Sequence, residues 1–422
     1  MNWVAGDADG RFADRRAGRS ATRRALGGPA AIWALHAGGK RGGQLSDRSS
    51  TAVLPADRSS TAVLPADRSS TAVLPADEDA DGMRAAVLTG GRLVVRDMRQ
   101  PVPGPGQLLL RVRLAGVCAT DLAAPAAGIP DGTVLGHELV GDVVDVGPGV
   151  AAGGLLGIGR RVVALPVQSC GACVACLGGD PVHCPMARIV GTGPGATGAF
   201  AELTVVSRHA ALPVPEAVPD EVAVLAEPLA AALRAVRRAG VGTADRVLVL
   251  GAGAIGLGAA AWARAVGARD VVVSDPLPMR RSLALGCGAS AAIDPSPGGT
   301  AVAYRALGRK RPTVVVDCSG AEEALCGGID LLGRGGRLVV AHLHTEPVRL
   351  GLRSAHFKEL TVTFSAWYEV DDFARTLEAL SSGSLPVAGV VTDVIALDEL
   401  PDAFVSLRRP TSQGKVAVDP RR

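Results

Sequence analysis

The segment 246–275 restricts the fold of this chain more than any other part of it. It contains a short apolar strand, a Gly-x-Gly-x-x-Gly turn, an apolar helix, a second apolar strand and an acidic residue. In this order the elements predict a βαβ unit that binds a dinucleotide, with the pyrophosphate at the amino end of the helix. Strand and helix candidates continue to alternate up to residue 341, which predicts an α/β fold with a doubly wound parallel sheet. The residues expected to bind the cofactor are Gly251, Gly253, Ala254, Ile255, Gly256, Asp275 and Arg280.

The acidic residue of this unit, Asp275, lies 19 residues after Gly256. A carboxylate at the end of the second strand can accept hydrogen bonds from both ribose hydroxyls of NAD, whereas it would repel the additional phosphate of NADP. Arg280 and Arg281 could neutralise such a phosphate, but they follow five and six residues later, on the next predicted helix. We therefore expect NAD to be the preferred cofactor.

Four cysteines lie close together outside this unit. Cys170, Cys173 and Cys176 are separated by two residues each, and Cys184 follows after seven more. Four thiolates at this spacing can meet at one tetrahedral ion, and zinc favours such a closed sulfur site. The alternative is a disulfide cluster, but we find no secretory signal before it and the other four cysteines are scattered. The pattern predicts a structural zinc site in a reducing, cytoplasmic compartment.

A second candidate metal site consists of Cys118, His137, Glu138 and Glu227. A catalytic zinc keeps one position open, and one thiolate, one imidazole and one or two carboxylates would supply its other ligands. Each residue also has an ordinary structural explanation. Buried cysteines usually fill a core, single histidines are often hydrogen-bonded within one, and Glu227 could begin a helix before Pro228.

Residues 1–82 differ in character from the remainder of the chain. A ten-residue unit, Asp-Arg-Ser-Ser-Thr-Ala-Val-Leu-Pro-Ala, occurs three times without change over 47–76. Each copy carries a proline and a polar stretch, so it can bury too little apolar surface to offset the cost of ordering its backbone. We expect 1–82 to be a disordered extension and the folded protein to begin near Met83.

Charge and composition exclude several classes of function. Of the 422 residues, 48% are hydrophobic, and the 44 basic and 41 acidic residues nearly cancel. No uninterrupted apolar run is long enough to cross a bilayer, and no basic patch accompanies a core pattern. We expect a soluble protein of two domains that binds neither nucleic acid nor a membrane.

Taken together, the motifs resemble the zinc-dependent medium-chain dehydrogenase/reductase superfamily, which includes the alcohol dehydrogenases, over 83–422. The segment 136–150, Gly-His-Glu-x-x-Gly-x5-Gly-x2-Val, matches the zinc signature of that superfamily, and the four-cysteine loop matches its structural zinc lobe. The Glu-Pro-Leu sequence at 227–229 and the closing Gly-Lys-Val-Ala-Val at 414–418 are similar to the butanediol, threonine and sorbitol dehydrogenases. The implied fold is a β-rich GroES-like catalytic domain, at 83–213 and 355–422, and a Rossmann nucleotide-binding domain at 214–354.

The resemblance also implies roles for single residues. Cys118, His137 and Glu227 would be ligands of a catalytic zinc, with Glu138 as a nearby or exchangeable one. Thr120 matches the hydroxyl that takes the substrate proton, and Asp121 matches the acid that orients the ligand histidine. One position departs from the pattern, because relatives such as the butanediol dehydrogenases often carry a relay histidine where this chain has Ala123. Water or another group would then complete the proton relay.

The implied function is a zinc-dependent oxidoreductase that transfers hydride between a secondary alcohol and NAD, with two zinc ions per chain. The substrate would be a small diol, polyol or threonine-like alcohol, and the assembly a homodimer or homotetramer. The alternative is a non-catalytic nucleotide-binding regulatory protein that retains the fold, and Ala123 is its main support. The joint presence of Cys118, His137 and Glu227 argues against that alternative.

Overall fold

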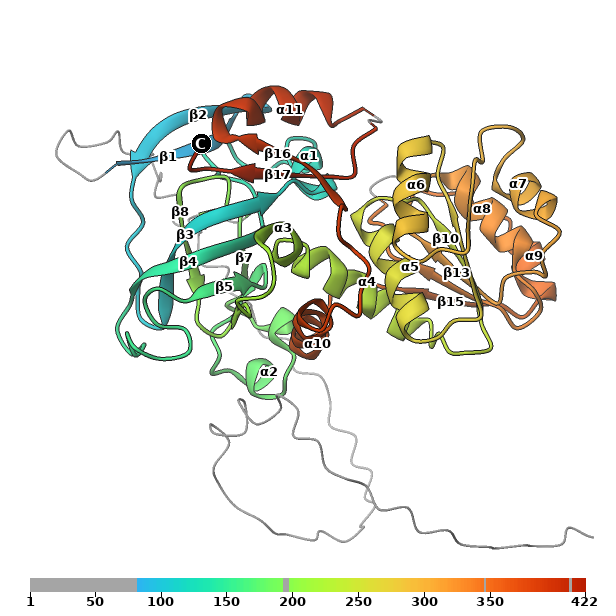
Figure 1. Ribbon diagram of the computed structural model, residues 1–422, viewed down its shortest axis with the longest axis horizontal. Coiled ribbons are helices and arrows are strands. Elements are labelled where there is room, and N and C mark those ends of the chain that lie inside the picture. Colours follow the sequence, from blue (N-terminus) through green and yellow to red (C-terminus); the bar gives the residue numbers. More distant parts are fainter. Residues whose placement is uncertain (1–81, 193–196, 345–346, 410–411) are drawn as a thin grey trace, which may run out of the picture. The chain divides into compact units, whose positions relative to one another are not determined.

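The structure is a computed structural model that describes residues 82–422 apart from 193–196, 345–346 and 410–411 (Figure 1). The predicted disordered extension and its repeats therefore lie outside the described residues, except for Gly82, which begins the first strand. Within the described ranges, no helix combines the length and the apolar character that crossing a bilayer would require. The strands of this part form two large sheets and two small antiparallel pairs.

The first large sheet has seven strands in the order β16-β17-β3-β4-β5-β9, and β8 also pairs with β3. All of its neighbours are antiparallel except β16 and β17. Its core includes Leu110, Phe200 and Phe404, which are fully buried. The strands are β3 (Gln107–Gly116), β4 (Glu138–Val146), β5 (Arg161–Ala164), β8 (Leu203–Ser207), β9 (Ala211–Pro213), β16 (Val391–Ala396) and β17 (Lys415–Asp419).

Smaller elements accompany this sheet. The hairpin strands are β1 (Gly82–Thr89) and β2 (Arg92–Arg99), and the second pair consists of β6 (Val167–Gln168) and β7 (Arg188–Ile189). The helices are α1 (Ala119–Ala123), α2 (Val174–Leu177), η3 (Pro181–His183), α3 (Asp220–Ala223), α10 (Val370–Ser381), η4 (Leu397–Glu399) and α11 (Leu400–Ser406).

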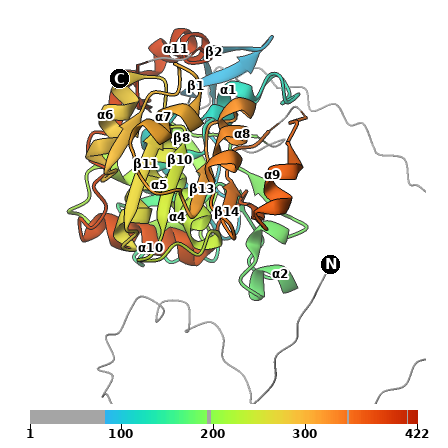
Figure 2. The same cartoon turned by 90° about the vertical axis from the view of Figure 1, so that its right-hand side faces the viewer.

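The second large sheet has six parallel strands in the order β12-β11-β10-β13-β14-β15, which confirms the predicted doubly wound sheet (Figure 2). Its strands are β10 (Arg246–Leu250), β11 (Asp270–Ser274), β12 (Ala291–Ile293), β13 (Val314–Asp317), β14 (Arg337–Val340) and β15 (Thr361–Phe364). The accompanying helices are α4 (Ala226–Arg238), α5 (Ala254–Ala265), α6 (Pro278–Gly286), α7 (Thr300–Ala306), α8 (Glu322–Leu331) and α9 (Leu352–Phe357).

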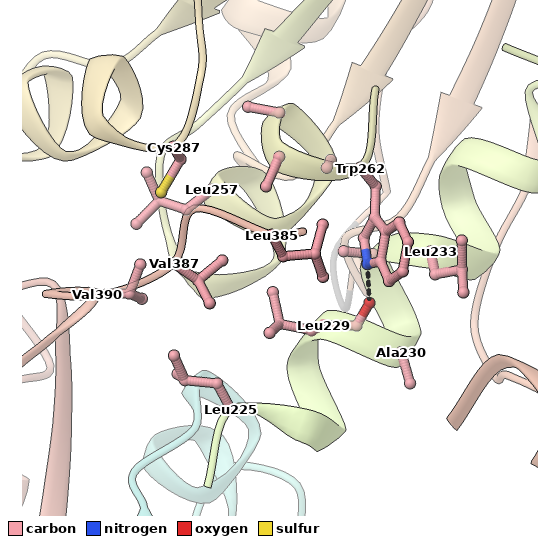
Figure 3. Packing of buried hydrophobic residues seen from close by; sticks show 14 of the residues in the cluster. Leu225, Leu229, Ala230, Leu233, Leu257, Trp262, Cys287, Leu385, Val387 and Val390 are labelled. Carbon is pink, nitrogen blue, oxygen red and sulfur yellow. Dashed lines mark hydrogen bonds between the residues drawn. The ribbon is translucent and has the colours of Figure 1, made fainter. Parts of the chain in front are cut away.

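The apolar strands of this sheet are buried on both faces, because successive side chains of a strand point to opposite sides. Val247 and Val249 of β10 belong to the same buried cluster as residues of α4 and α5, whereas Leu248 and Leu250 belong to a cluster with residues of α7 and α8. Figure 3 shows the first cluster, in which the indole N–H of Trp262 donates a hydrogen bond to the Leu229 carbonyl at 2.9 Å. This bond satisfies a buried polar group where α5 meets α4.

One boundary differs from the sequence-based expectation. The nucleotide-binding sheet extends beyond residue 354, since β15 pairs with β14. Helix α9 and β15 thus precede the return of the chain to the antiparallel sheet.

Candidate active site and zinc centres

Asp121 connects the two loops that carry the predicted catalytic ligands. It lies in α1, a short helix that begins directly after Cys118, and only 1% of its surface is exposed. One carboxylate oxygen accepts a hydrogen bond from the Cys118 amide at 2.9 Å, and the other accepts bonds from the Gly136 amide and from Nδ1 of His137, both at 3.2 Å. Asp121 therefore holds the His137 ring and both backbone segments in one arrangement.

Three of the four predicted ligands of the catalytic centre lie together. Ligand atoms of Cys118, His137 and Glu138 are all within 4.8 Å of one another. The pairing of β3 with β4 explains this, because its register places Gly116 opposite Glu138 and so brings the residues after β3 next to those before β4. Since Asp121 occupies Nδ1 of His137, Nε2 is the nitrogen left for a metal ion.

The charges around His137 favour a cation at this point. Burial alone would lower the pKa of His137, but the Asp121 carboxylate and the Cys118 thiol outweigh it and raise the pKa well above its ordinary value. A thiolate, an imidazole and carboxylate oxygens are also the donor set that zinc accepts in catalytic sites. The electrostatics and the donor chemistry thus both fit zinc.

Glu138 supplies a second observation in favour of a metal ion. Nζ of Lys415 lies 2.7 Å from each of its carboxylate oxygens, but the hydrogen bond goes to Oε1, and the buried Oε2 has no hydrogen-bond partner. Gly116 makes room for this oxygen, because a Cβ at that position would lie 2.1 Å from Oε2. The Lys415 ammonium compensates the charge of Oε2, but this oxygen makes no hydrogen bond and keeps its lone pairs for a metal ion.

Glu227, the fourth predicted ligand, lies outside the group of three. It is the second residue of α4, and its Oε1 accepts a hydrogen bond from the Tyr368 hydroxyl at 3.1 Å. Burial raises its pKa to about 7, and the negative charge of Glu138 adds to the effect while His137 opposes it. The charges of the centre thus affect the pKa of Glu227, but Glu138 is the carboxylate that the structure groups with Cys118 and His137.

Thr120, the predicted proton acceptor, is close to the same centre. Its Oγ1 lies 3.4 Å from Nε2 of His137, and its side chain is exposed to solvent. Ala123, which stands where relatives carry a relay histidine, is exposed as well. Water therefore has access to both positions.

The four-cysteine loop has the geometry of a tetrahedral zinc site. Its sulfur atoms all lie within 4.8 Å of one another. The sulfur–sulfur distance is 3.9 Å between Cys170 and Cys176, 3.5 Å between Cys173 and Cys176, and 3.6 Å between Cys184 and Cys170. Tetrahedral zinc with Zn–S bonds of about 2.3 Å would separate its sulfurs by about 3.8 Å. All eight cysteines of the chain are free, so the disulfide alternative finds no support. Backbone amides, first that of Ala172, lower the pKa of Cys170 to about 6, which favours the thiolate.

The glycine turn has the properties that the sequence predicts. Gly251 has φ +85°, and a Cβ there would lie 2.9 Å from the Cα of Ser319. Gly253 faces open space, with no atom within 4 Å of an added Cβ, and Ala254 and Ile255 begin α5. Gly256 packs so closely that a Cβ would lie 1.9 Å from the Gly251 carbonyl.

Asp275 follows β11 and is almost fully buried, with 4% of its surface exposed. Its carboxylate accepts hydrogen bonds from the amides of Ala252, at 2.8 Å, and Leu277, at 2.9 Å, so it also stabilises the glycine turn. Arg280 lies on α6, as expected, and its Nε donates a hydrogen bond to the Gln413 carbonyl at 3.2 Å. Arg281 instead donates to the Asp275 carbonyl, at 2.9 Å.

Two residues of the catalytic region were missed by reasoning from the sequence. Lys415 belongs to the closing Gly-Lys-Val-Ala-Val sequence, whose likeness to relatives was a usable signal, although it did not indicate Glu138 as the partner. Tyr368 offers no signal, because only the tertiary fold brings it to Glu227, 141 positions earlier.

Comparisons with known proteins agree with this arrangement of two sheets and two candidate zinc centres, which defines a zinc-binding dehydrogenase. Residues 104–216 match the alcohol dehydrogenase GroES-like domain family, and residues 254–382 match the zinc-binding dehydrogenase family. L-Threonine 3-dehydrogenase of Sinorhizobium medicae is 31% identical over 353 residues, covering 80% of this chain and 98% of the relative. The chain belongs to the zinc-dependent medium-chain dehydrogenase/reductase superfamily.

Solved structures support the same conclusion. A zinc-binding dehydrogenase from Sinorhizobium meliloti bound to NADP has a TM-score of 0.70 at 30% identity, covering 81% of this chain and all of the other. An alcohol dehydrogenase from Escherichia coli CFT073 complexed with NADH has a TM-score of 0.72 at 27% identity, with coverages of 80% and 99%. The chain is therefore a zinc- and NAD(P)-dependent oxidoreductase that acts on a CH–OH group, and the non-catalytic alternative loses its support.

Proposed function

We propose that this enzyme oxidises a small secondary alcohol of the diol, polyol or threonine type with NAD, at a zinc centre formed by Cys118, His137 and a carboxylate. The observation that supports it most directly is the grouping of Cys118, His137 and Glu138 within 4.8 Å. Zinc at this point would supply a Lewis acid that makes a bound hydroxyl easier to deprotonate. The substrate type is supported by the similarity to an L-threonine 3-dehydrogenase, which is 31% identical to this chain.

The residues of the chain then have distinct tasks in the reaction. Asp121 holds His137 through Nδ1 and so fixes the tautomer and the ring. Thr120 accepts the proton of the substrate hydroxyl, and because its side chain is exposed, water takes the proton onward without the histidine that Ala123 replaces. The glycine turn between β10 and α5 holds the pyrophosphate of the cofactor.

The test is NADH formation with L-threonine, butanediols and polyols, with and without added zinc, together with the zinc content of the protein. We expect two zinc ions per chain, turnover of at least one class of substrate, and loss of turnover when the catalytic zinc is removed. His137→Ala should remove one zinc per chain and nearly all turnover, while NADH still binds to the other domain. Full activity of a zinc-depleted His137→Ala enzyme would contradict the mechanism.

We also propose that the four cysteines hold a structural zinc and that the enzyme works in the cytoplasm, since all its cysteines are free. A homodimer or homotetramer is supported by the outer strand of the parallel sheet, β15. It carries exposed Val362 and Phe364, and an edge strand with exposed apolar side chains offers a surface for pairing with a second chain. Light scattering of the purified protein would test this assembly.

A further inference from the structure

Tyr368 lies in the segment that connects β15 to α10, and its side chain belongs to the environment of the catalytic centre. It follows β15 and precedes α10, only 8% of its surface is exposed, and its hydroxyl donates the hydrogen bond to Oε1 of Glu227 at 3.1 Å. Tyr368 belongs to none of the sequence motifs described above. The bond joins a predicted zinc ligand to an aromatic side chain from a distant part of the sequence.

The ring of Tyr368 is held independently of this bond. It stacks on Phe373 of α10, with ring centroids 5.9 Å apart and an interplanar angle of 8°. On another side it lines a small apolar cavity of about 10 Å³ together with Leu165, Val182 and Trp367. The stacking on Phe373 restricts the ring and favours the orientation in which its hydroxyl meets Glu227.

The two carboxylates of the centre have different partners. Lys415 donates to Glu138, whereas Tyr368 donates to Glu227. A lysine adds a positive charge next to its carboxylate, but a phenol hydroxyl adds only a directed hydrogen bond. Tyr368 therefore orients Glu227 without adding a charge that would compete with a cation for this carboxylate.

We propose that Tyr368 is a positioning residue for the catalytic zinc centre. Its hydroxyl holds the Glu227 carboxylate apart from Glu138 and in place to bind the metal ion. The inference rests on the proposed function, in which a carboxylate completes the zinc centre, and it adds that Glu227 serves as such a ligand. Outer hydrogen-bond partners of metal ligands typically contribute about 10–100-fold to metal affinity. Tyr368 should therefore affect zinc retention at this centre and leave the four-cysteine centre unchanged.

The chain offers a matched control, because it contains only two tyrosines. Tyr304 is also buried, with 2% of its surface exposed, and its hydroxyl donates to the Lys310 carbonyl at 2.9 Å. Tyr304→Phe and Tyr368→Phe thus each remove one hydroxyl and one hydrogen bond while the ring stays in place. The two variants should lose similar amounts of thermal stability, and a merely structural role for Tyr368 predicts no further difference.

The experiment measures zinc release from the zinc-loaded enzyme into a chromogenic chelator. We expect Tyr368→Phe to release one zinc per chain about 10–100 times faster than the wild type, and Tyr304→Phe to release both ions at the wild-type rates. Cobalt(II) introduced at the faster-exchanging centre should also show a changed visible absorption spectrum in Tyr368→Phe alone.

Identical release rates and cobalt spectra in wild type, Tyr304→Phe and Tyr368→Phe would overturn the role of Tyr368. This outcome is distinguishable from a failure of the proposed function. A wild-type enzyme that binds only one zinc per chain, at the four cysteines, would instead contradict the catalytic centre itself. Faster release of both ions in Tyr368→Phe would indicate general destabilisation and would also count against the proposal.

Discussion

Lys415 and Glu138 form a buried ion pair although 277 positions separate them in the chain. Lys415 begins β17 and Glu138 begins β4, and both of these strands pair with β3. The exposed fractions of their side chains are 5% and 1%, and Nζ also donates to the Val117 carbonyl at 3.0 Å. The positive charge therefore compensates one carboxylate of the proposed catalytic centre from inside the protein.

Replacing Lys415 with Met should destabilise the protein strongly, because Glu138 would be left buried and unpaired. Removing one partner of a buried ion pair costs about 3–5 kcal/mol, and Lys415→Arg should recover part of this loss. Urea unfolding of the two variants and of the wild type measures the difference. Lys310→Met, at an exposed lysine, serves as the control and should stay within about 0.5 kcal/mol of the wild type.

Zinc binding to the metal-free protein should release protons in a pH-dependent way. Burial raises the pKa of Glu227 to about 7, so at pH 6.5 this carboxyl is largely protonated and must lose its proton to bind zinc. Glu227→Gln has no such proton. At pH 6.5 the wild type should therefore release more protons than the variant, and this difference should be smaller at pH 8.5.

Calorimetry in buffers of different ionisation enthalpy measures the number of protons released. Protons from the four-cysteine loop are common to both proteins and cancel in the comparison. A difference that does not change between these two pH values would show that Glu227 is not the titrating group.

Cys184→Ser should remove the zinc of the four-cysteine loop and lower the melting temperature, because a structural zinc contributes folding energy. Turnover at low temperature should persist, since the catalytic centre keeps its own residues. Zinc analysis should show a decrease from two ions to one. Cys326→Ser is the matched control, because Cys326 lies outside both clusters. Lost turnover with unchanged stability would contradict the structural assignment.

Asp275→Ser should shift cofactor preference from NAD toward NADP. The carboxylate that would repel the 2′-phosphate is removed, and Arg280 and Arg281 remain on α6. Because Asp275 also accepts hydrogen bonds from Ala252 and Leu277, the variant should lose about 1–3 kcal/mol of stability as well.

The informative measurement is therefore the ratio of kcat/KM with NAD to that with NADP, not activity alone. Asp275→Asn is the second variant, since it removes the charge but keeps an acceptor for the turn. A wild type that prefers NADP, or a ratio that is the same in all three proteins, would show that Asp275 does not select the cofactor.

Deleting residues 1–81 should leave activity and melting temperature essentially unchanged. The repeats at 47–76 offer no periodic apolar face, whereas β1 begins at Gly82, which pairs with Arg99 of β2. A longer deletion that also removes β1 serves as the contrasting variant. It should prevent folding, because Met83 and Val87 are buried in the core. If the protein that lacks only residues 1–81 fails to fold, the expectation of disorder is contradicted.

Local patterns in the sequence determined much of the fold and of the metal chemistry. The Gly-x-Gly-x-x-Gly turn requires a tight left-handed turn at Gly251 and close packing at Gly256, and both are present. The four cysteines are close in sequence, so short loops alone can bring their sulfur atoms together. The spacing of residues within one segment carries this information, because the backbone limits how neighbouring residues can be arranged.

Only the tertiary structure decided how distant residues combine at the catalytic centre. Strand pairing places Glu138 beside Cys118 and His137, β17 adds Lys415, and the segment after β15 adds Tyr368. The tertiary structure also groups Glu138, not Glu227, with the other two ligands, and it brings Arg280 into contact with the Gln413 carbonyl. The physical reason is that these contacts depend on the register of strands and the packing of side chains from separate elements. A single sequence specifies neither of them locally, since each becomes favourable only when the whole core is assembled.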